Sequence, residues 1–183
     1  ALSDEEVIFK EVQGKLWYIK YPIEDSDSFV EIATTRPETM LGDAAIAVNP
    51  SDKRFKDLIG KNAILPLVNK AIPIISDTMV DPEFGTGCVK ITPAHDPNDY
   101  NVGKNHELEM LNIMNPDGSI NSNAPKQYIG LTREDARKKI INDLNAAGAL
   151  LKEEDYIHKV GFSERGDVPI EYYLSNQWFL KMK

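Results

Sequence analysis

The sequence predicts a mainly β protein of the α+β class, with a β-barrel core and peripheral helices. Two observations carry this prediction: many short runs of β-branched and aromatic residues alternate with turn residues, and only two or three stretches have helical spacing. The chain has 183 residues, 42% of them hydrophobic and 27% charged, so it is long enough to bury a sizeable core. We therefore expect one strand-rich domain.

Most strands are predicted in the first half of the chain. Gly14 separates two runs that predict a hairpin, and Asn69 separates two more. Pro66 and Pro73 place the second pair at sheet edges or bends, because proline lacks the N–H group that a strand donates. Residues 50–58 predict a helix. The strands expected here are residues 7–13, 16–21, 29–34, 44–48, 64–68 and 72–75.

A glycine-rich turn and a short strand are expected at residues 84–92. Gly85 and Gly87 allow either positive φ angles or a close approach of a ligand to the backbone. The alternation that follows predicts a strand with Lys90 and Thr92 on one face. This face is more polar than that of an ordinary core strand.

A helix start is predicted directly after this strand. Pro93 ends the strand, and Asp96 before Pro97 is typical of an N-cap at the start of a helix over residues 97–109. Asp99 then falls in the first helical turn, near the polar face of the strand. A lysine, a threonine and two carboxylates thus converge, which predicts a site for a small polar ligand.

The last third of the chain contains the clearest helix. It begins after Thr132 as N-cap, has Asp135 in its first turn and apolar residues at helical spacing, and stops at Gly148. Residues 115–118 predict a turn. The later candidates are strands at residues 150–161 and 168–174 and an apolar tail at residues 178–180.

Composition excludes several classes of function. No run approaches the eighteen or so apolar residues of a membrane helix, and the first residues lack a signal-peptide pattern, so neither a membrane nor an export role is expected. The net charge of −8 argues against wrapping duplex nucleic acid, but not against gripping one nucleotide end. Cys88, the single cysteine, is expected to be a packed residue in a reducing, cytoplasmic setting.

A second polar cluster occupies residues 34–43, reading T-T-R-P-E-T-M-L-G-D. Taken alone, it is equally typical of a capped turn with solvated charges. Together with G-T-G at residues 85–87 and P-A-H-D-P-N-D at residues 93–99, it resembles the editing (CP1) domain of the class I valyl-, isoleucyl- and leucyl-tRNA synthetases. Glu38 and the A-H-D-P-N-D form resemble the valyl branch of this family.

The resemblance covers nearly the whole chain and implies a β-barrel decorated with helices. The HIGH and KMSKS signatures, with which the family uses ATP, are absent from the sequence. We therefore expect residues 1–183 to be one editing domain cut out of a longer synthetase, monomeric and unable to aminoacylate. Its expected partners are the remaining domains of that synthetase and the 3′-terminal adenosine of mischarged tRNA(Val).

The reaction that the resemblance implies is hydrolysis of the aminoacyl ester of Thr-tRNA(Val), with Val-tRNA(Val) spared. Valine and threonine are nearly isosteric, so a hydrophobic pocket cannot strongly reject threonine; valyl enzymes are the known example of this limit. A second site can hydrogen-bond the hydroxyl group that valine lacks. Because the ester is already activated, an oriented water suffices, and neither a metal nor another cofactor is expected.

The resemblance also implies roles for single residues. Asp99 is expected to hold the α-ammonium group of the substrate through a charge-assisted hydrogen bond. Lys90, Thr92 and Asp96, the other expected catalytic residues, are candidates for reading the hydroxyl group and positioning water. Besides Asp99, the expected substrate-binding residues are Thr34, Thr35, Arg36, Glu38, Thr39, Phe84, Gly85, Gly87 and His95. Phe84 is either a stacking wall for adenine or a core residue.

Three alternatives stay open from sequence alone. A metal-dependent hydrolase would use His95, Asp96 and Asp99 as ligands, although His106 and His158 lie at unhelpful spacing for a second pair. The domain could belong to the isoleucyl branch of the family. It could also be a catalytically silent module that only binds the tRNA 3′ end.

Overall fold

The computed structural model describes residues 6–174, and strands dominate this part of the chain, which confirms the mainly β prediction. The strands are β1 (Val7–Pro22), β2 (Phe29–Thr34), β3 (Ala45–Val48), β4 (Asn62–Leu65), β5 (Lys70–Ser76), β6 (Cys88–Ile91) and β7 (Leu150–Ser163). The helices are α1 (Pro97–Asn105) and α2 (Arg133–Ala146), with 3-10 turns η2 (Pro37–Gly42), η3 (Lys56–Leu58) and η4 (Lys126–Tyr128).

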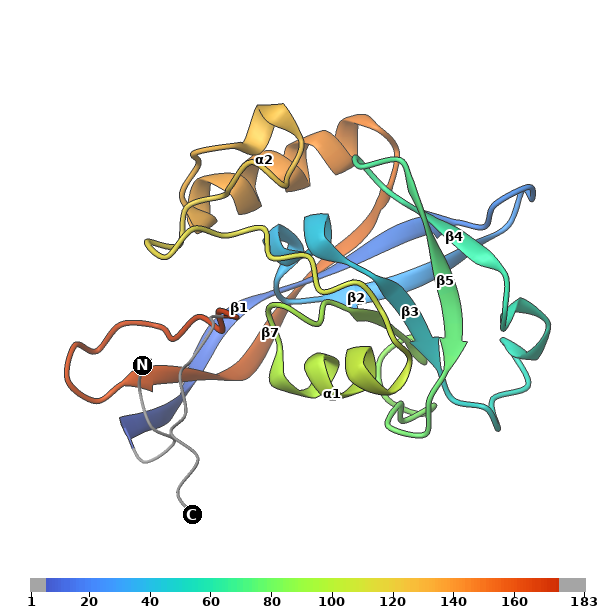
Figure 1. The fold of residues 1–183 in the computed structure, drawn as a ribbon, viewed down its shortest axis with the longest axis horizontal. Helices are drawn as coiled ribbons and strands as arrows, with labels where there is room; N and C mark the ends of the chain where they lie inside the picture. Colours follow the sequence, from blue (N-terminus) through green and yellow to red (C-terminus); the bar gives the residue numbers. More distant parts are fainter. Residues whose placement is uncertain (1–5, 175–183) are drawn as a thin grey trace, which may run out of the picture.

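The described strands form two sheets, with the orders β2-β1-β7 and β4-β5-β3-β6 (Figure 1). A barrel requires a continuous ladder that returns to its first strand. Here β2 contacts β6 without a ladder between them, and the bridge between Ile23 and Ala63 links the sheets at one point. The described sheets therefore do not close into the expected barrel.

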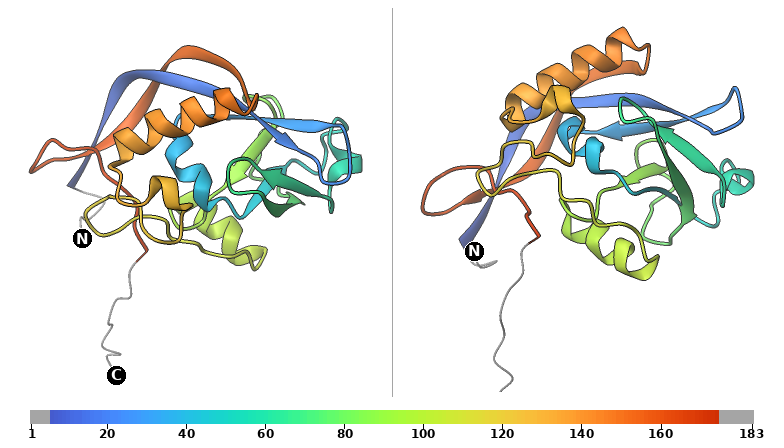
Figure 2. Two further views of the ribbon diagram at one scale, coloured as in Figure 1. Left: turned by 90° about the horizontal axis from the view of Figure 1, so that it is seen from above. Right: turned by 45° about the horizontal axis from the view of Figure 1, so that its top comes forward.

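The main hydrophobic core lies between the two sheets and α2. Strand β3 is buried on both faces: Ile46 and Val48 point into this core, whereas Ala45 and Ala47 join a second cluster with Val102 of α1. Helices α1 and α2 lie on opposite sides of the molecule (Figures 1 and 2). The core side of α2 repeats at helical spacing through Ala136, Ile140 and Leu144.

The expected N-terminal hairpin is wrong, because β1 is one strand of 16 residues that runs through Gly14. Its partners come from elsewhere in the chain. Strand β7 pairs with it from Val7 to Ile19, and β2 pairs with its second half, starting at Trp17 opposite Thr34. Figure 2 shows β1 and β7 as a long curved ribbon that reaches past the rest of the protein.

Proline positions explain part of the second sheet. Strands β4 and β5 pair as the predicted hairpin, and Pro66 lies in the turn between them. Pro73, however, lies in β5 between two neighbours instead of at an edge. The pairing of β5 with β3 begins only at Ile74, opposite Ile46, so Pro73 needs no N–H group on that side.

Other predicted elements are shorter than expected or absent. The helix expected at 50–58 is reduced to η3, and α1 ends at Asn105 because the chain turns at Glu107, which has a φ of 54°. Residues 168–174 form no strand apart from the bridge between Phe162 and Pro169. The predicted tail at 178–180 lies outside the described residues.

Candidate functional site

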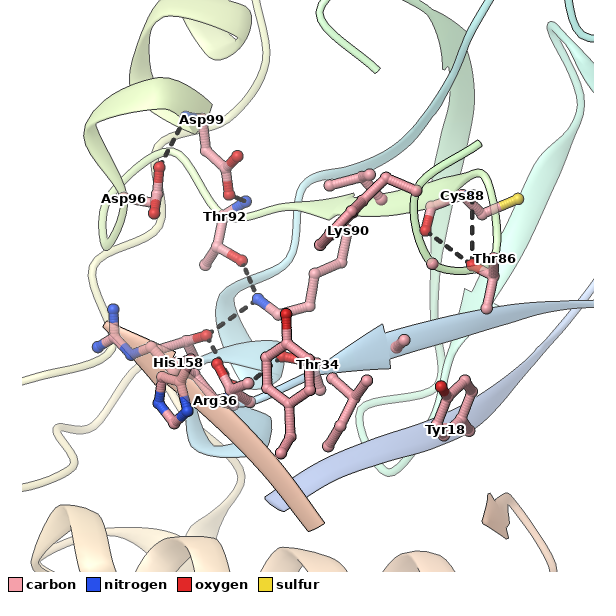
Figure 3. A pocket seen from close by; sticks show the side chains of 18 of the residues that line it. Tyr18, Thr34, Arg36, Thr86, Cys88, Lys90, Thr92, Asp96, Asp99 and His158 are labelled. Atoms are coloured by element: carbon pink, nitrogen blue, oxygen red, sulfur yellow. Dashed lines mark hydrogen bonds between the residues drawn. The ribbon is translucent and has the colours of Figure 1, made fainter. Parts of the chain in front are cut away.

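A cleft of about 600 Å³ is lined by residues of both sheets and of the start of α1 (Figure 3). Both polar motifs of the sequence contribute to it, so the structure brings them together as expected. The expected site residues that line the cleft are Thr34, Thr35, Arg36, Thr39, Phe84, Gly85, Lys90, Thr92, His95, Asp96 and Asp99.

A fully buried carboxylate, which sequence reasoning did not single out, lies behind the polar face of β6. Asp43 follows η2 and accepts hydrogen bonds from the hydroxyls of Tyr21 at 2.7 Å and Thr92 at 2.6 Å, and from Lys90 Nζ at 3.1 Å. Burial raises the pKa of Asp43, while Lys90 and the two hydroxyls act to lower it. Its sequence signal is its place as the last residue of the first motif.

Lys90 joins the two motifs. Besides Asp43, its Nζ donates to the hydroxyl oxygens of Thr39 at 2.9 Å and Thr92 at 2.5 Å, and only 11% of its side chain is exposed. An ammonium group has three protons, so all three have partners within the protein. The Thr92 proton is likewise given to Asp43. Neither side chain has a proton left for a substrate, and Thr92 retains only an acceptor lone pair.

The two aspartates at the start of α1 have different tasks. Asp96 is the predicted N-cap and accepts from the N–H groups of Asn98 at 2.8 Å and Asp99 at 3.2 Å. Asp99 is 8% exposed and its Oδ2 accepts from the N–H group of Thr92 at 2.8 Å. Burial raises the pKa of Asp99 to about 6. Among the described residues no donor bonds its Oδ1, which leaves one oxygen for a cationic partner.

Arg36 binds the second motif rather than lying free on the surface. Its Nη1 donates to the backbone carbonyl of His95 at 3.0 Å, and its Nη2 pairs with Glu171. Its Nε lies 3.6 Å from a carboxylate oxygen of Glu38, and 28% of the side chain is exposed. The cleft therefore has an arginine at its border, held by backbone and carboxylate partners.

His95 is buried and held as a neutral ring. Its Nε2 accepts from the N–H group of Ile113 at 3.1 Å, and its Nδ1 lies 3.4 Å from the carbonyl oxygen of Tyr172. Burial lowers the pKa of His95 to about 4. Both nitrogens thus face the backbone, which speaks against a metal site at His95. Among residues 6–174, no group of three or more His, Cys, Asp and Glu is placed to hold a metal ion.

Two expected site residues do not line the cleft. Glu38 is fully buried, and Arg137 of α2 binds its two oxygens at 2.9 and 2.8 Å. Burial acts to raise the pKa of Glu38, but Arg137 outweighs it and holds that pKa below its usual value. Gly87 has a φ of 77°, and a Cβ there would lie 2.4 Å from Arg54 Nη2, so it serves close packing of the turn.

Phe84 is not a core residue, since 67% of it is exposed while it borders the cleft. Pro82, two residues before Phe84, is fixed by Arg54. The Nη2 of Arg54 donates to the carbonyl of Pro82 at 2.6 Å and also pairs with Asp52. Gly85 next to it has a φ of 60° and open space around it. Of the two interpretations of Phe84, stacking on a ligand is the one that stays a prediction.

Sequence reasoning missed a whole wall of the cleft. Strands β1 and β7 supply it, and their residues are far apart in the chain, so only their pairing brings them together. The available signal was the alternation in residues 150–161. The cleft residues not expected from sequence are Leu16, Tyr18, Ala33, Thr86, Cys88, Val89, Glu154, Tyr156, His158 and Lys159. Burial raises the pKa of the Cys88 thiol to about 12, as suits a packed residue.

The fold and the two joined motifs define an editing domain of an aminoacyl-tRNA synthetase, and the chain belongs to this family. Residues 55–145 match the family model described as the editing domain of leucyl-tRNA synthetase. The ternary LeuRS-tRNA-LeuAMS complex of Agrobacterium radiobacter K84 agnB2 has a similar fold. Its TM-score is 0.59 at 21% identity, over 82% of this chain and 20% of that chain.

Within the family, close relatives of the chain are valyl enzymes. It is 57% identical to the valine--tRNA ligase of Thermosynechococcus vestitus, 58% to that of Lacticaseibacillus casei and 57% to that of Bacillus subtilis, each over 100% of the chain. These relatives confirm the valyl prediction. The chain spans 20–21% of their length. None of the helices in residues 6–174 has the length and apolar character needed to cross a membrane.

Proposed function

We propose that the domain hydrolyses the aminoacyl ester of Thr-tRNA(Val) and spares Val-tRNA(Val). The observation that carries the proposal is Asp99, whose buried carboxylate has one free oxygen in a cleft that both family motifs line. The α-ammonium group of an aminoacyl ester is the natural partner of such an oxygen. A charge-assisted bond in a partly desolvated cleft is also stronger than one in water.

In this proposal, the domain distinguishes threonine from valine through groups that accept a hydrogen bond from the threonine hydroxyl. Because the protons of Lys90 and Thr92 are already given to protein partners, a substrate hydroxyl would donate its own proton. With Asp99 assigned to the ammonium group, the acceptors proposed for this hydroxyl are the second lone pair of Thr92 and the carboxylate of Asp96, both of which line the cleft. A valyl substrate leaves such groups unpaired, which costs about 1–3 kcal/mol per buried group.

Water is the proposed nucleophile. The Cys88 thiol has a pKa raised to about 12, and the basic nitrogen of His95 is engaged by the N–H group of Ile113. Asp96, Asp99 and backbone groups of the cleft are left to orient a water on the ester, which is already activated. This chemistry needs no metal, so EDTA should leave the rate unchanged.

The test is hydrolysis of Thr-tRNA(Val) set against Val-tRNA(Val), by this chain and by the full-length parent enzyme. We expect faster loss of the threonyl ester with the wild type and not with Asp99→Asn. Binding of a threonyl-adenosine analogue without turnover by either protein would instead support a silent binding module. Turnover by the full-length enzyme alone would show that other domains are needed to present the tRNA.

The remaining partners belong to the same proposal. We assign the cleft to the 3′-terminal adenosine of mischarged tRNA(Val), and residues 1–183 to one domain of a longer synthetase. The identity to valine--tRNA ligases over the full chain, at about a fifth of their length, supports this assignment. The fragment should not aminoacylate. A monomeric state and a cytoplasmic location stay predictions.

A further inference from the structure

The β7 wall of the cleft contains a histidine that the proposed reaction does not use. His158 lines the cleft, and its Nδ1 is buried without a hydrogen-bond partner in the described residues. The ring stacks on Tyr156, with centroids 6.0 Å apart and planes inclined by 18°. Buried polar atoms without a partner are rare, so this nitrogen needs an explanation.

Gly14 on β1 fixes where the His158 ring lies. A Cβ at position 14 would lie 2.7 Å from Cε1 and 3.3 Å from Nδ1 of that ring. Gly14 lies within regular strand, opposite Tyr156, and has no left-handed φ, so the glycine is needed for space and not for its backbone freedom. The Nδ1 edge of the ring is therefore packed on the β1 backbone.

This packing decides which nitrogen carries the proton. A proton on Nδ1 would be a buried donor without an acceptor, and orphaned buried N–H groups are rarer in proteins than under-satisfied acceptors. The proton is then on Nε2, the other ring nitrogen, which is not among the atoms closest to Gly14. Unlike Nδ1, Nε2 is not buried, and it has no partner among residues 6–174. His158 thus offers one free N–H donor on the cleft side.

We propose that His158 is a binding residue for the terminal nucleotide, to which its Nε2–H donates a hydrogen bond. This inference rests on the proposed function. In Figure 3, Asp96 and Asp99 border the cleft on the α1 side and His158 borders it on the β7 side. If the aminoacyl group is held by Asp99, the nucleotide extends toward β7. Its acceptors are the nitrogens and hydroxyl oxygens of the nucleoside and the phosphate oxygens.

Three substitutions separate the donor from the packing of the ring. His158→Leu removes both nitrogens, His158→Asn carries an amide near the position of Nδ1, and His158→Gln reaches the position of Nε2 with an N–H donor. The probe is 3′-threonylamino-3′-deoxyadenosine, which cannot be hydrolysed, with and without a 5′-phosphate. We expect the Leu and Asn variants to bind about three- to tenfold more weakly, as one net hydrogen bond implies, and the Gln variant to bind nearly as well as wild type.

The two probes locate the acceptor. A loss with both probes assigns it to the nucleoside, and a loss only with the 5′-phosphate assigns it to a phosphate oxygen. In deacylation, KM should rise in the Leu variant while kcat changes little, because the contact is equally present in the ground and transition states. The melting temperature of each variant, measured first, shows that the fold is kept.

Several results would overturn the inference. Equal dissociation constants for wild type and His158→Leu with both probes would do so. So would a Gln variant that binds the probes as weakly as the Leu variant, since the loss would then come from the packing of the ring and not from the N–H donor. A wild type that binds neither probe would also refute it. These failures are distinct from failure of the proposed function, which is a wild type that binds the probes but hydrolyses neither Thr-tRNA(Val) nor Val-tRNA(Val) in the full-length enzyme.

Discussion

The ammonium group of Lys90 lies 3.1 Å from a carboxylate oxygen of Asp43, in a pair whose carboxylate side chain is fully buried. The two residues come from different motifs, one from β6 and one from the end of η2. A buried charge that loses its partner is far more costly than the pair itself is stabilising. The pair therefore holds the back of the cleft together, and Lys90 is a supporting residue before it is a contact for substrate.

Removing either partner of this pair should destabilise the fold. We expect Lys90→Ala to lower the free energy of unfolding by about 3–5 kcal/mol, because Asp43 is left buried with only its hydroxyl partners. Asp43→Ala should have a loss of similar size. Urea unfolding at neutral pH measures both.

A double-mutant cycle provides the control for this prediction. Lys90→Met together with Asp43→Asn removes both charges and keeps the volume of both side chains. The loss of stability in this double variant should be well below the sum of the losses in Lys90→Met alone and Asp43→Asn alone, since neither charge is left unpaired in the double variant. Additive losses would contradict the idea that the pair acts as a unit.

Local features of this site could be predicted from sequence because they depend on neighbouring residues. The cap of α1 by Asp96 involves residues two and three positions later, and the turn before β6 follows from its two glycines. The cap of α2 by Thr132, which accepts from the N–H group of Asp135, is of the same kind. The meeting of the two motifs followed from the family resemblance.

Long-range pairing decided the features that sequence could not give. Whether Glu38 faces a ligand or the core depends on Arg137, 99 residues later in the chain. The wall that contains His158 exists only because β7 pairs with β1, and the same pairing makes β1 a single strand. Closure into a barrel depends on ladder bonds between β2 and β6, for which hydrophobic pattern gives no register.

Glu38 should act on stability rather than on binding. Glu38→Gln breaks a buried ion pair, and we expect a loss of about 3 kcal/mol, the low end for such pairs because 38% of the Arg137 side chain is exposed. Since the pKa of Glu38 is lowered in the fold, the wild-type contribution is present above the ordinary pKa of 4.5 and is lost as the pH falls below it. Glu134→Gln on α2, the helix of Arg137, is the control; the Glu134 side chain is 64% exposed, so this change should affect stability little.

Phe84 should contribute to binding and not to the fold. Stacking of a base on an aromatic side chain is worth about 1–3 kcal/mol, so Phe84→Ala should weaken binding of the threonyl-adenosine analogue by that amount. Because Phe84 is 67% exposed, the melting temperature of the Phe84→Ala protein should stay within a degree or so of that of the wild type. Phe84→Tyr should bind normally, and Met79→Ala, at an apolar residue 43% exposed outside the cleft, serves as the surface control. Unchanged affinity in Phe84→Ala would exclude stacking.

The raised pKa of Asp99 predicts a pH-dependent stability. Its pKa is about 6 in the fold against an ordinary value of 3.8, so the native state holds this proton to a higher pH than the unfolded chain does. Stability from this group is full below about pH 4 and is lost as the pH rises through 6, on the order of 3 kcal/mol in all. Asp99→Asn does not titrate, so its stability relative to wild type should rise between pH 4 and pH 7. A constant difference between the two proteins would contradict the raised pKa.

Asp99 also predicts the pH dependence and the charge requirement of deacylation. Only the ionised carboxylate opposes the substrate ammonium group, so kcat/KM should rise as the pH increases through about 6, after correction for spontaneous ester hydrolysis. In the complex the ammonium group lowers the pKa of Asp99, so kcat should level off at a lower pH.

Asp99→Asn keeps the size of the side chain but removes its charge, and the loss should be on the order of 2–5 kcal/mol in transition-state stabilisation. Asp96→Asn is the matched control for the cap of α1, since Asn caps a helix nearly as well as Asp, and it should leave the fold intact. If Asp99→Asn deacylates Thr-tRNA(Val) at a rate near that of the wild type, Asp99 does not bind the substrate ammonium group. Its role would then be structural, as the acceptor for the N–H group of Thr92.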